Sequence, residues 1–352
     1  MRSLSYKNII SIDKENMLQH LLDFPSQCKM AFEIANEVEL FSLKKDFDKI
    51  VFLGMGGSAI AGDLVRAYLY KEIDIPILVL RDYDIPAYLD QNTLVFVSSF
   101  SGNTEETISS YQQAKQKKAS FILISSGGRL KELSLNDKNI FIQIPSGLPP
   151  RCALGYLGII PLRILERLGL VRDHQEEYHE LNYVLEDLKN RLNPKVAKLD
   201  NLAKYIALKL YNKLPILYTS SLNFDVVAKR FQNQLNENAK ILALSNCFPE
   251  MNHNEIEGYF NLKKLFKHLV VLFLKDNEFH PQVKKRIEIT SQIIKEKGIP
   301  VLEINSYGKY LLSRIFSLIY IGDFISYYLA ILYNTDPTPV KVISFLKQKL
   351  KE

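Results

Sequence analysis

The sequence predicts an α/β fold of two doubly wound parallel sheets with helices on both faces. Short apolar runs of strand type alternate with segments of helical periodicity from residue 50 onward, which is the pattern of parallel βαβ units. The alternation starts again near residue 213, which indicates an internal repeat of two related halves. Two strands of the first half end in turns of glycine and hydroxyl residues, Gly54–Ser58 and Ser98–Thr104.

The first half begins with a predicted helix over residues 14–40, where apolar side chains recur at intervals of three and four residues. The strands predicted after it are Ile50–Leu53, Ile77–Leu80, Leu94–Val97, Phe121–Ile124 and Ile140–Ile144. A helix is expected after the first strand and another over about residues 104–118, whose acidic start suits a helix dipole.

The second half repeats this order. The strand from Pro215 runs into small polar residues at Ser220, and a helix through Val226 and Phe231 follows. Leu269–Leu274, a helix from about residue 281 and Val301–Ile304 then match the later part of the first half. We therefore expect three segments: an N-terminal half with its leading helix (1–165), connecting helices (166–212), and a C-terminal half that ends in a helix (213–352).

Length and composition fit two ordinary domains with full cores, since the chain has 352 residues and is 47% hydrophobic. No uninterrupted apolar run approaches the length of a membrane span, and Met1–Lys7 lacks the apolar core of a signal peptide. Three scattered cysteines suit a reducing cytoplasm better than a disulfide framework or a zinc cluster. A net charge of +6 without a basic cluster among aromatic residues disfavours nucleic acid as a partner.

The two polar turns are candidate phosphate sites. Glycines and hydroxyls between a strand and a helix present N–H and O–H donors at the positive end of the helix dipole, and two such turns can flank one anion. The glycine spacing is not a dinucleotide fingerprint, although Asp82 or Asp84 after the second strand leaves a nucleotide open. A tight turn without a ligand is the structural alternative, but the density of hydroxyls in Ser98–Thr104 argues against it.

Polar clusters of the second half, with one arginine of the first, supply candidates for proton transfer. Glu237, set among amide side chains, suits a general base, with a plain helix-end carboxylate as the alternative. His253, between two asparagines, is the best proton-transfer candidate of six histidines; His174, by contrast, is expected on a solvated helical face. Arg151 follows two prolines that restrict its backbone, although it could equally be a surface arginine after a turn. Metal-ligand spacing is absent.

Together these motifs resemble the sugar isomerase (SIS) domain family and, within it, the bifunctional phosphoglucose/phosphomannose isomerases. The matching segments run in order from about residue 50 to the end of the chain: Gly54–Ser58, Ser99–Thr107, Pro149–Arg151, Asn236–Lys240, Asn252–Glu255 and Asp336–Val340, followed by Ile343, Leu346 and Lys347. The hydroxyl-rich turn alone identifies only the wide family, whereas the segments around Glu237 and His253 narrow it strongly. Phe100 stands where the family more often has tyrosine.

The resemblance implies an aldose–ketose isomerase that interconverts glucose 6-phosphate or mannose 6-phosphate with fructose 6-phosphate through a cis-enediol(ate). It implies that Glu237 moves the proton, that Arg151 stabilises the enediolate, and that His253, assisted by Lys347, opens the sugar ring. The phosphate ligands that it implies are Gly56, Gly57, Ser58, Ser99, Ser101 and Thr104.

The resemblance also implies a homodimer whose subunits share each site, with the histidine supplied by the neighbour. We expect a cytoplasmic enzyme without a metal or another cofactor, acting on a hexose 6-phosphate and not bound to nucleic acid or membrane. Two alternatives remain at this point: an isomerase of another sugar phosphate on the same fold, and a non-catalytic sugar-phosphate sensor. A sensor of this fold usually carries a helix-turn-helix domain, which the segment before residue 50 does not contain.

Overall fold

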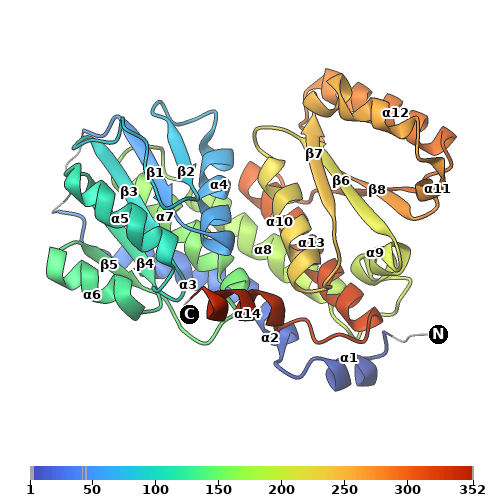
Figure 1. Ribbon diagram of the computed structural model, residues 1–352, viewed down its shortest axis with the longest axis horizontal. Coiled ribbons are helices and arrows are strands. Elements are labelled where there is room, and N and C mark those ends of the chain that lie inside the picture. The colour runs from blue at the N-terminus through green and yellow to red at the C-terminus, as the bar shows by residue number, and fades with distance from the viewer. Residues whose placement is uncertain (1–3, 42, 44–45, 351–352) are drawn as a thin grey trace. The chain divides into compact units, whose positions relative to one another are not determined.

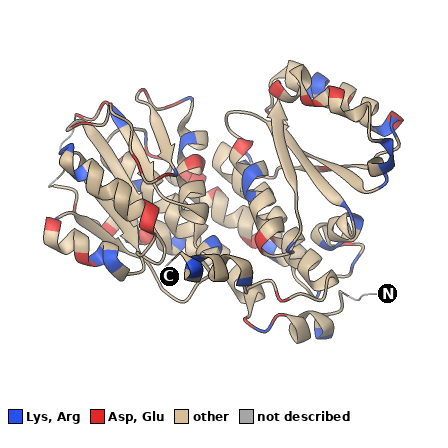
Figure 2. Cartoon of the chain, viewed as in Figure 1, with Lys and Arg blue, Asp and Glu red and all other residues tan. Residues whose placement is uncertain are grey.

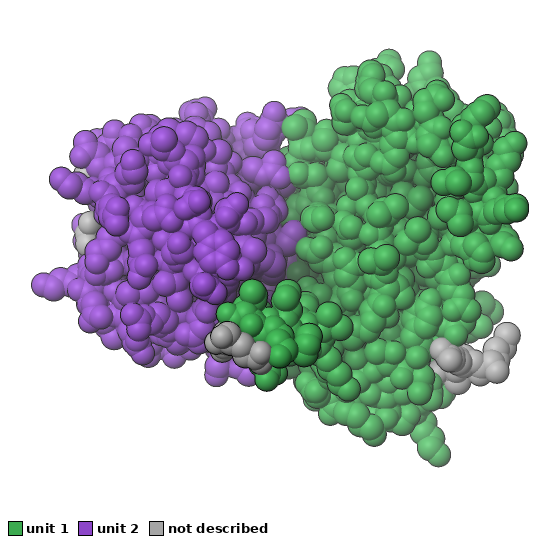
Figure 3. Space-filling model, viewed as in Figure 1, with its two compact units in different colours: residues 1–22, 183–352 green, residues 23–182 purple. Residues whose placement is uncertain are grey.

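The computed structural model describes residues 4–41, 43 and 46–350, so Met1–Ser3 of the segment considered for a signal peptide lie outside it. The chain divides into two compact units (Figure 3): unit 1 comprises Met1–Leu22 and Tyr183–Glu352, and unit 2 comprises Asp23–Asn182. This division differs from the expected boundaries, because the start of the chain groups with the C-terminal half and the second boundary falls inside one helix, α8 (Gln175–Leu192).

Unit 2 is built around a five-stranded parallel sheet of order β2-β1-β3-β4-β5 (Figure 1). Its strands are β1 (Lys49–Leu53), β2 (Ile77–Leu80), β3 (Thr93–Ser98), β4 (Ser120–Ser125) and β5 (Ile140–Gln143). β1 and β3 lie side by side in the middle, with Leu53 opposite Val97, and every residue of β3 is buried. Continuous apolar strands of this kind are typical of a sheet covered on both faces.

Helices cover both faces of that sheet. α4 packs on β1 and β2 and against α7, and α3 packs against α7 as well. α5 packs on β3, and α6 packs on β4 and β5. The bounds are α3 (Phe24–Glu37), α4 (Gly56–Leu69), α5 (Glu105–Gln116), α6 (Gly128–Asp137), the 3₁₀ turn η1 (Pro150–Cys152) and α7 (Leu154–Arg167). Val51, Leu53, Val97, Tyr111 and Leu123 belong to the core beneath α5.

Unit 1 contains a four-stranded parallel sheet of order β7-β6-β8-β9. Its strands are β6 (Leu214–Ser220), β7 (Leu244–Phe248), β8 (Leu269–Lys275) and β9 (Val301–Asn305). The first four strands of unit 2 have the same order. In each sheet the second strand lies on one side of the first strand, and the third and fourth strands follow on its other side. The shared order confirms the predicted pair of related, doubly wound parallel sheets.

The helices of unit 1 include one central apolar helix. α10 lies on one side of the sheet and α12 on the other (Figure 1), while α13 packs against α9 and α10. The elements are α1 (Tyr6–Ile12), α2 (Met17–Leu22), α9 (Leu202–Leu210), α10 (Asp225–Glu237), η2 (Glu250–His253), η3 (Glu255–Tyr259), α11 (Lys263–Phe266), α12 (Pro281–Glu296), α13 (Leu311–Leu332) and α14 (Lys341–Lys349).

α13 is long and apolar enough to cross a membrane by length and composition, and within the described ranges it is the one helix that meets that test. Its most apolar window is completely buried inside the structure, however, and α9 and α10 pack against it. α13 therefore has the position of a core helix. The charged side chains lie mainly on the outer helices and loops, and the strands carry few of them (Figure 2).

The start of the chain joins unit 1 through buried polar contacts. The Tyr327 hydroxyl of α13 donates to Asp13 at 3.0 Å, and the same carboxylate accepts the N–H groups of Met17 and Leu18 at the start of α2. The Tyr320 hydroxyl donates to the Leu21 carbonyl at 2.7 Å. These bonds explain why residues before 23 belong with the C-terminal half.

Unit 2 contains a buried histidine between two carboxylates. His174, just before α8, has its Nδ1 2.8 Å from Glu166 of α7 and its Nε2 2.8 Å from Glu72 beyond α4. Its side chain is 0% exposed, so the expectation of a solvated histidine is wrong. Its partners lie 8 and 102 residues away along the chain, so its polar sequence neighbours did not reveal them. Burial alone would lower the pKa of His174, but the two carboxylates outweigh burial and raise it.

Candidate active site

The two polar turns of unit 2 lie next to each other. They follow β1 and β3, which are parallel neighbours in the sheet, so both turns lie at the carboxyl ends of these strands. The strand order reverses between β1 and β3, because β2 lies on one side of this pair and β4 on the other. In open parallel sheets, the crevice at such a switch point is where ligands bind.

Glycines allow the backbone of the two turns to approach closely. A Cβ on Gly54 would lie 2.9 Å from the Ser98 carbonyl oxygen, so a side chain there would separate the turns. Gly102 has a φ of +69°, and a Cβ on it would lie 1.8 Å from the Gly127 carbonyl oxygen. Neither position has room for any other residue, and the turns keep their shape for this reason.

Hydroxyl groups and helix N-termini meet at these turns. The Ser99 and Thr104 side-chain oxygens are 2.8 Å apart, Ser58 and Ser99 are buried, and Ser101 is exposed. α4 and α5 begin here, and the side chains of their N-cap residues, Met55 and Thr104, make no capping hydrogen bond. No N-cap side chain therefore competes with an anion for the first N–H groups of these helices, of which the Ser58 N–H already donates to the Met55 carbonyl at 3.0 Å.

Gly57 brings Arg151 to the first turn. A Cβ on Gly57 would lie 3.1 Å from the Pro150 carbonyl oxygen and 3.3 Å from the Arg151 Cα, so η1 packs directly on the start of α4. Arg151 is 4% exposed. Burial excludes the alternative of an ordinary surface arginine and places a cation beside the polar turns of the same unit.

In unit 1, Glu237 lines a cavity of about 670 Å³. Glu237 is the last residue of α10, and the cavity is enclosed by the residues after α10 and by the segment that leads into α14. The lining residues used below are Glu237, Lys240, Thr335, Asp336, Pro339 and Lys341. Glu237 is half-buried, which leaves its carboxylate room to meet a ligand.

His253 lies at the other end of the same βαβ unit. α10 runs back from the end of β6 to the start of β7, so Glu237 lies where the strands begin, whereas His253 in η2 follows the end of β7. The five residues of β7 separate the two levels by roughly 15 Å at 3.3 Å per residue. The structure therefore does not bring Glu237 and His253 of one chain together.

The exposed His253 is carried by a well-anchored segment. Asn252 donates from Nδ2 to Thr290 Oγ1 at 2.9 Å. Glu255 accepts the Tyr218 hydroxyl at 2.5 Å and an Asn246 amide hydrogen, so a carboxylate two residues from His253 is tied to β6 and β7. His253 is thus presented outward on a rigid support, an arrangement that sequence spacing could not reveal.

Lys341, not Lys347, is the α14 lysine that lines the Glu237 cavity. Both lysines are exposed, and they lie nearly two turns apart on α14. The role predicted for Lys347 stays a prediction.

In unit 1, a carboxylate of the chain itself lies at the carboxyl end of β8, which corresponds to the end of β3 in unit 2. Asp276, after β8, is 4% exposed and accepts the Ser306 hydroxyl at 2.6 Å, Arg314 Nε at 2.9 Å and the Glu278 N–H at 2.8 Å. A hydroxyl, a guanidinium and a backbone amide are the donors that a phosphate would use. The donors at the turn after β8 are therefore already used by Asp276.

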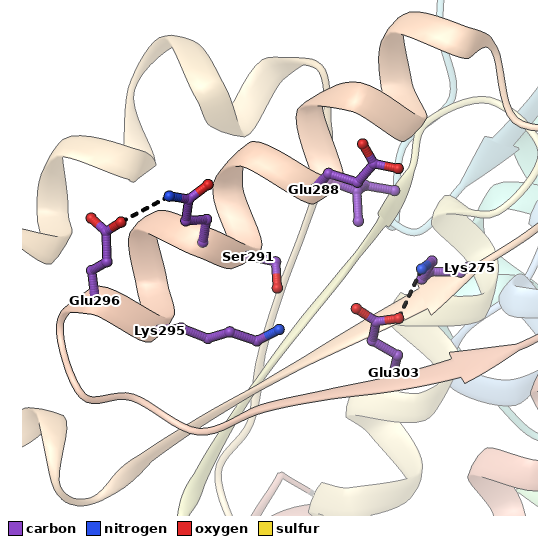
Figure 4. Close-up of a pocket in the computed structure, with 8 residues that line it drawn as sticks. Lys275, Glu288, Ser291, Lys295, Glu296 and Glu303 are labelled. Carbon is purple, nitrogen blue, oxygen red and sulfur yellow. Dashed lines mark hydrogen bonds and ion pairs between the residues drawn. The ribbon is translucent and has the colours of Figure 1, made fainter.

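A further cavity of about 550 Å³ lies between α12 and the β8–β9 edge (Figure 4). Two pairs of its polar side chains are bonded to each other, with Lys275 2.8 Å from Glu303 and Gln292 bonded to Glu296 at 3.0 Å. It contains none of the residues predicted for the site. Among the residues that the structure describes, no group of three or more His, Cys, Asp or Glu side chains could hold a metal ion.

The cysteines do not have the surroundings of nucleophiles. Cys28 and Cys152 are buried, and burial raises the pKa of the Cys28 thiol far above its ordinary value and that of Cys247 to about 12. Raised values keep both groups as thiols at neutral pH. The polar turns, Arg151, Glu237 and His253 remain as the candidate functional groups.

The doubly wound fold with polar turns at its switch point agrees with the class of SIS-domain proteins, and the family models match both halves of the chain. The SIS domain family model matches residues 44–142, and the model of the bacterial phospho-glucose isomerase C-terminal SIS domain matches residues 199–350. A solved structure of the hypothetical protein TT0462 from Thermus thermophilus has the same fold, with a TM-score of 0.77 over 97% of this chain and 93% of that one at 14% identity.

The chain belongs to the family of bifunctional phosphoglucose/phosphomannose isomerases. A protein of that name from Caldicellulosiruptor bescii is 46% identical over 96% of this chain and 99% of its own length. A D-glucosamine-6-phosphate 4-epimerase from Sulfolobus acidocaldarius is 33% identical over 61% of this chain and 65% of its own length. The family thus agrees with the resemblance seen in the motifs.

Proposed function

We propose that this protein interconverts glucose 6-phosphate and mannose 6-phosphate with fructose 6-phosphate. The main observation behind the proposal is that a buried arginine lies against a glycine- and hydroxyl-rich turn in unit 2. The cavity of about 670 Å³ that Glu237 lines in unit 1 adds to it. Membership of the family supports the choice of substrates, because the names of its members include phosphoglucose and phosphomannose.

Each group has a role that matches its chemistry. The turns grip the phosphate, which is remote from the reacting carbons and fixes the open chain in register. Glu237 removes the proton from one of the first two carbons and returns it to the other, and Arg151 stabilises the charge of the cis-enediolate. His253, assisted by Lys347, transfers the protons that open the ring. We propose that this reaction uses no metal and no other cofactor.

The positions of Glu237 and His253 favour a homodimer. Ring opening and the C1–C2 proton transfer act on adjacent atoms of one sugar, yet Glu237 and His253 of one chain lie at opposite ends of the strands. We propose that His253 acts on a substrate bound by a second copy of the chain. A non-catalytic sensor would not need a base, an arginine and a histidine together, so we propose an enzyme. We propose a cytoplasmic location for it.

The test is an assay of each sugar phosphate separately, with fructose 6-phosphate formation followed through a coupling enzyme. Turnover of both substrates, unchanged by a chelator, supports the proposal. Turnover of neither contradicts it. The epimerase relative makes a second sugar phosphate reaction a specific candidate, so glucosamine 6-phosphate belongs in the same experiment.

The shared site is tested by co-expressing two variants that are each inactive, Glu237→Gln and His253→Ala. If the residues of one site come from different chains, half of the dimers are mixed and one of their two sites is intact. About a quarter of the wild-type activity then returns. If each chain supplies both residues, every site carries a defect and no activity returns.

A further inference from the structure

The cavity around Glu237 has two walls that are far apart in the sequence. One wall is the end of α10 with the residues that follow it, and the other is the irregular segment from Thr335 to Val340 that leads into α14. A base that removes a proton from carbon has to be held in register with its target, because a displacement of about 1 Å can cost 10²-fold in rate. The two walls therefore need a connection.

The α10 wall is fixed from behind. Asn238, the residue after Glu237, is 0% exposed and donates from Nδ2 to Ser326 Oγ of α13 at 2.9 Å. Arg230 and Asp323 form a buried ion pair of 2.6 Å between the same two helices. Buried polar pairs have few alternative partners, so the end of α10 keeps its place on α13.

The segment wall has weaker support. Thr335 donates its N–H to the Ala330 carbonyl, and Asp336 accepts the Lys14 N–H at 3.2 Å. Beyond these residues, Pro337 and Pro339 lack N–H groups, and α14 contains no buried residue. Residues 337–340 are held in part by the burial of Pro337 and by the Thr338 N–H, which donates to Asp336 at 3.0 Å, and a bond from another element to one of their carbonyl groups adds to this support.

Lys240 joins the two walls. Its φ of +57° turns the chain back toward the end of α10, and its Nζ donates to the Glu237 carbonyl and, at 2.9 Å, to the Pro337 carbonyl. The ammonium also lies at the negative end of the α10 dipole, where a cation is stabilised. One side chain therefore bonds the residue proposed as the base and the loop opposite it.

We propose that Lys240 is a positioning residue that holds residues 337–340 against the end of α10 and so keeps the Glu237 cavity in its working shape. The effect on turnover rests on the proposed function. The connection between the walls does not, and it can be tested separately. Lys240 need not touch the substrate to act in this way.

Hydrogen exchange tests the connection. The variants are Lys240→Met, the conservative Lys240→Arg, and Lys264→Met as a control at an exposed lysine of α11. In Lys240→Met, the hydrogen-bonded amides of peptides covering residues 335–346, which include Thr335, Thr338 and Ser344, should exchange at least about tenfold faster, because the local opening loses a charge-assisted bond. Lys240→Arg should restore most of the protection and the control should match the wild type. Unchanged exchange in Lys240→Met overturns the proposal.

Kinetics then test the consequence for Glu237. With glucose 6-phosphate, Lys240→Met should lower kcat about tenfold and change KM less than about threefold, because the phosphate grip is intact while the base is loosely placed. Lys240→Arg should recover most of kcat. Faster exchange with an unchanged kcat, or a loss confined to KM, overturns the positioning role. If the wild type turns over no sugar phosphate, the proposed function fails, and the exchange result still decides whether Lys240 joins the walls.

Discussion

Replacing His174 with glutamine tests the buried charge cluster of unit 2. Glutamine keeps a hydrogen-bonding side chain of similar length but removes the imidazolium charge. The groups that face His174 are Glu166 and Glu72, and Glu166 is also held by Arg163 at 2.8 Å and by the Tyr178 hydroxyl at 2.9 Å.

The cost follows from how these groups are buried. Removing one partner of a buried pair costs about 3–5 kcal/mol. The side chain of Glu166 is 2% exposed and loses its partner without gaining water, whereas that of Glu72 is 27% exposed and can be hydrated. With Arg163 and Tyr178 still in place, we expect the lower end, about 3 kcal/mol, which is roughly 6–12 °C for a unit of this size.

The loss should depend on pH with a definite sign. Because the pKa of His174 is raised in the folded protein, its stabilisation is fully present below the unfolded value of about 6.5. It is lost as the pH rises through the folded value. Calorimetric unfolding of the wild type and His174→Gln should therefore show the largest gap in Tm near pH 6 and a smaller gap in alkaline solution. His179→Gln, at an exposed position of α8, is the control.

A gap that widens as the pH rises would refute the charged state assigned to His174. A gap of the same size at all pH values would show that packing, not charge, accounts for the loss. A Tm equal to that of the wild type at pH 6 would show that the carboxylates are satisfied without the imidazolium.

Three further predictions concern the candidate site. Glu237→Gln should abolish turnover while calorimetric binding of glucose 6-phosphate persists; retained turnover would remove Glu237 from its role. Ser101→Ala combined with Thr104→Ala should raise KM more than it lowers kcat in the coupled assay, whereas a fall in kcat at constant KM would contradict an anchoring role. Gly102→Ala should destabilise unit 2 by roughly 2 kcal/mol or more, because its Cβ would lie 1.8 Å from a carbonyl oxygen, whereas Gly147→Ala, with no atom within 4 Å, should cost only the left-handed backbone. Equal Tm values for the two glycine variants would refute this packing argument.

The sequence predicted what local patterns encode. The apolar strands, the polar turns after β1 and β3 and the repeated alternation of strands and helices are confirmed, because each depends on residues close in the chain. α13 was not predicted, since a helix that is apolar on all sides has no periodicity to detect. β7, Leu244–Phe248, also escaped prediction because it is short and polar in its middle.

The site could be predicted only in part. Residue type and local context singled out Glu237, His253 and Arg151, and burial beside Gly57 supports an ordered position for Arg151. The sequence could not show that Glu237 and His253 lie at opposite ends of the strands, because this depends on the parallel pairing of β7 with β6. Lys240 was missed as well, since its two acceptors are backbone carbonyls, one of them about a hundred residues away.

The grouping of residues 1–22 with the C-terminal unit has a consequence for biosynthesis. Unit 2 is complete once residue 182 has left the ribosome, and it can fold while translation continues. Tyr320 and Tyr327, the partners of Leu21 and Asp13, are made 299 and 314 residues after them. α1 and α2 therefore leave the ribosome long before their partners in α13 are made. A chain whose translation stops before α13 would contain all of unit 2 but would lack the partners of Asp13 and Leu21.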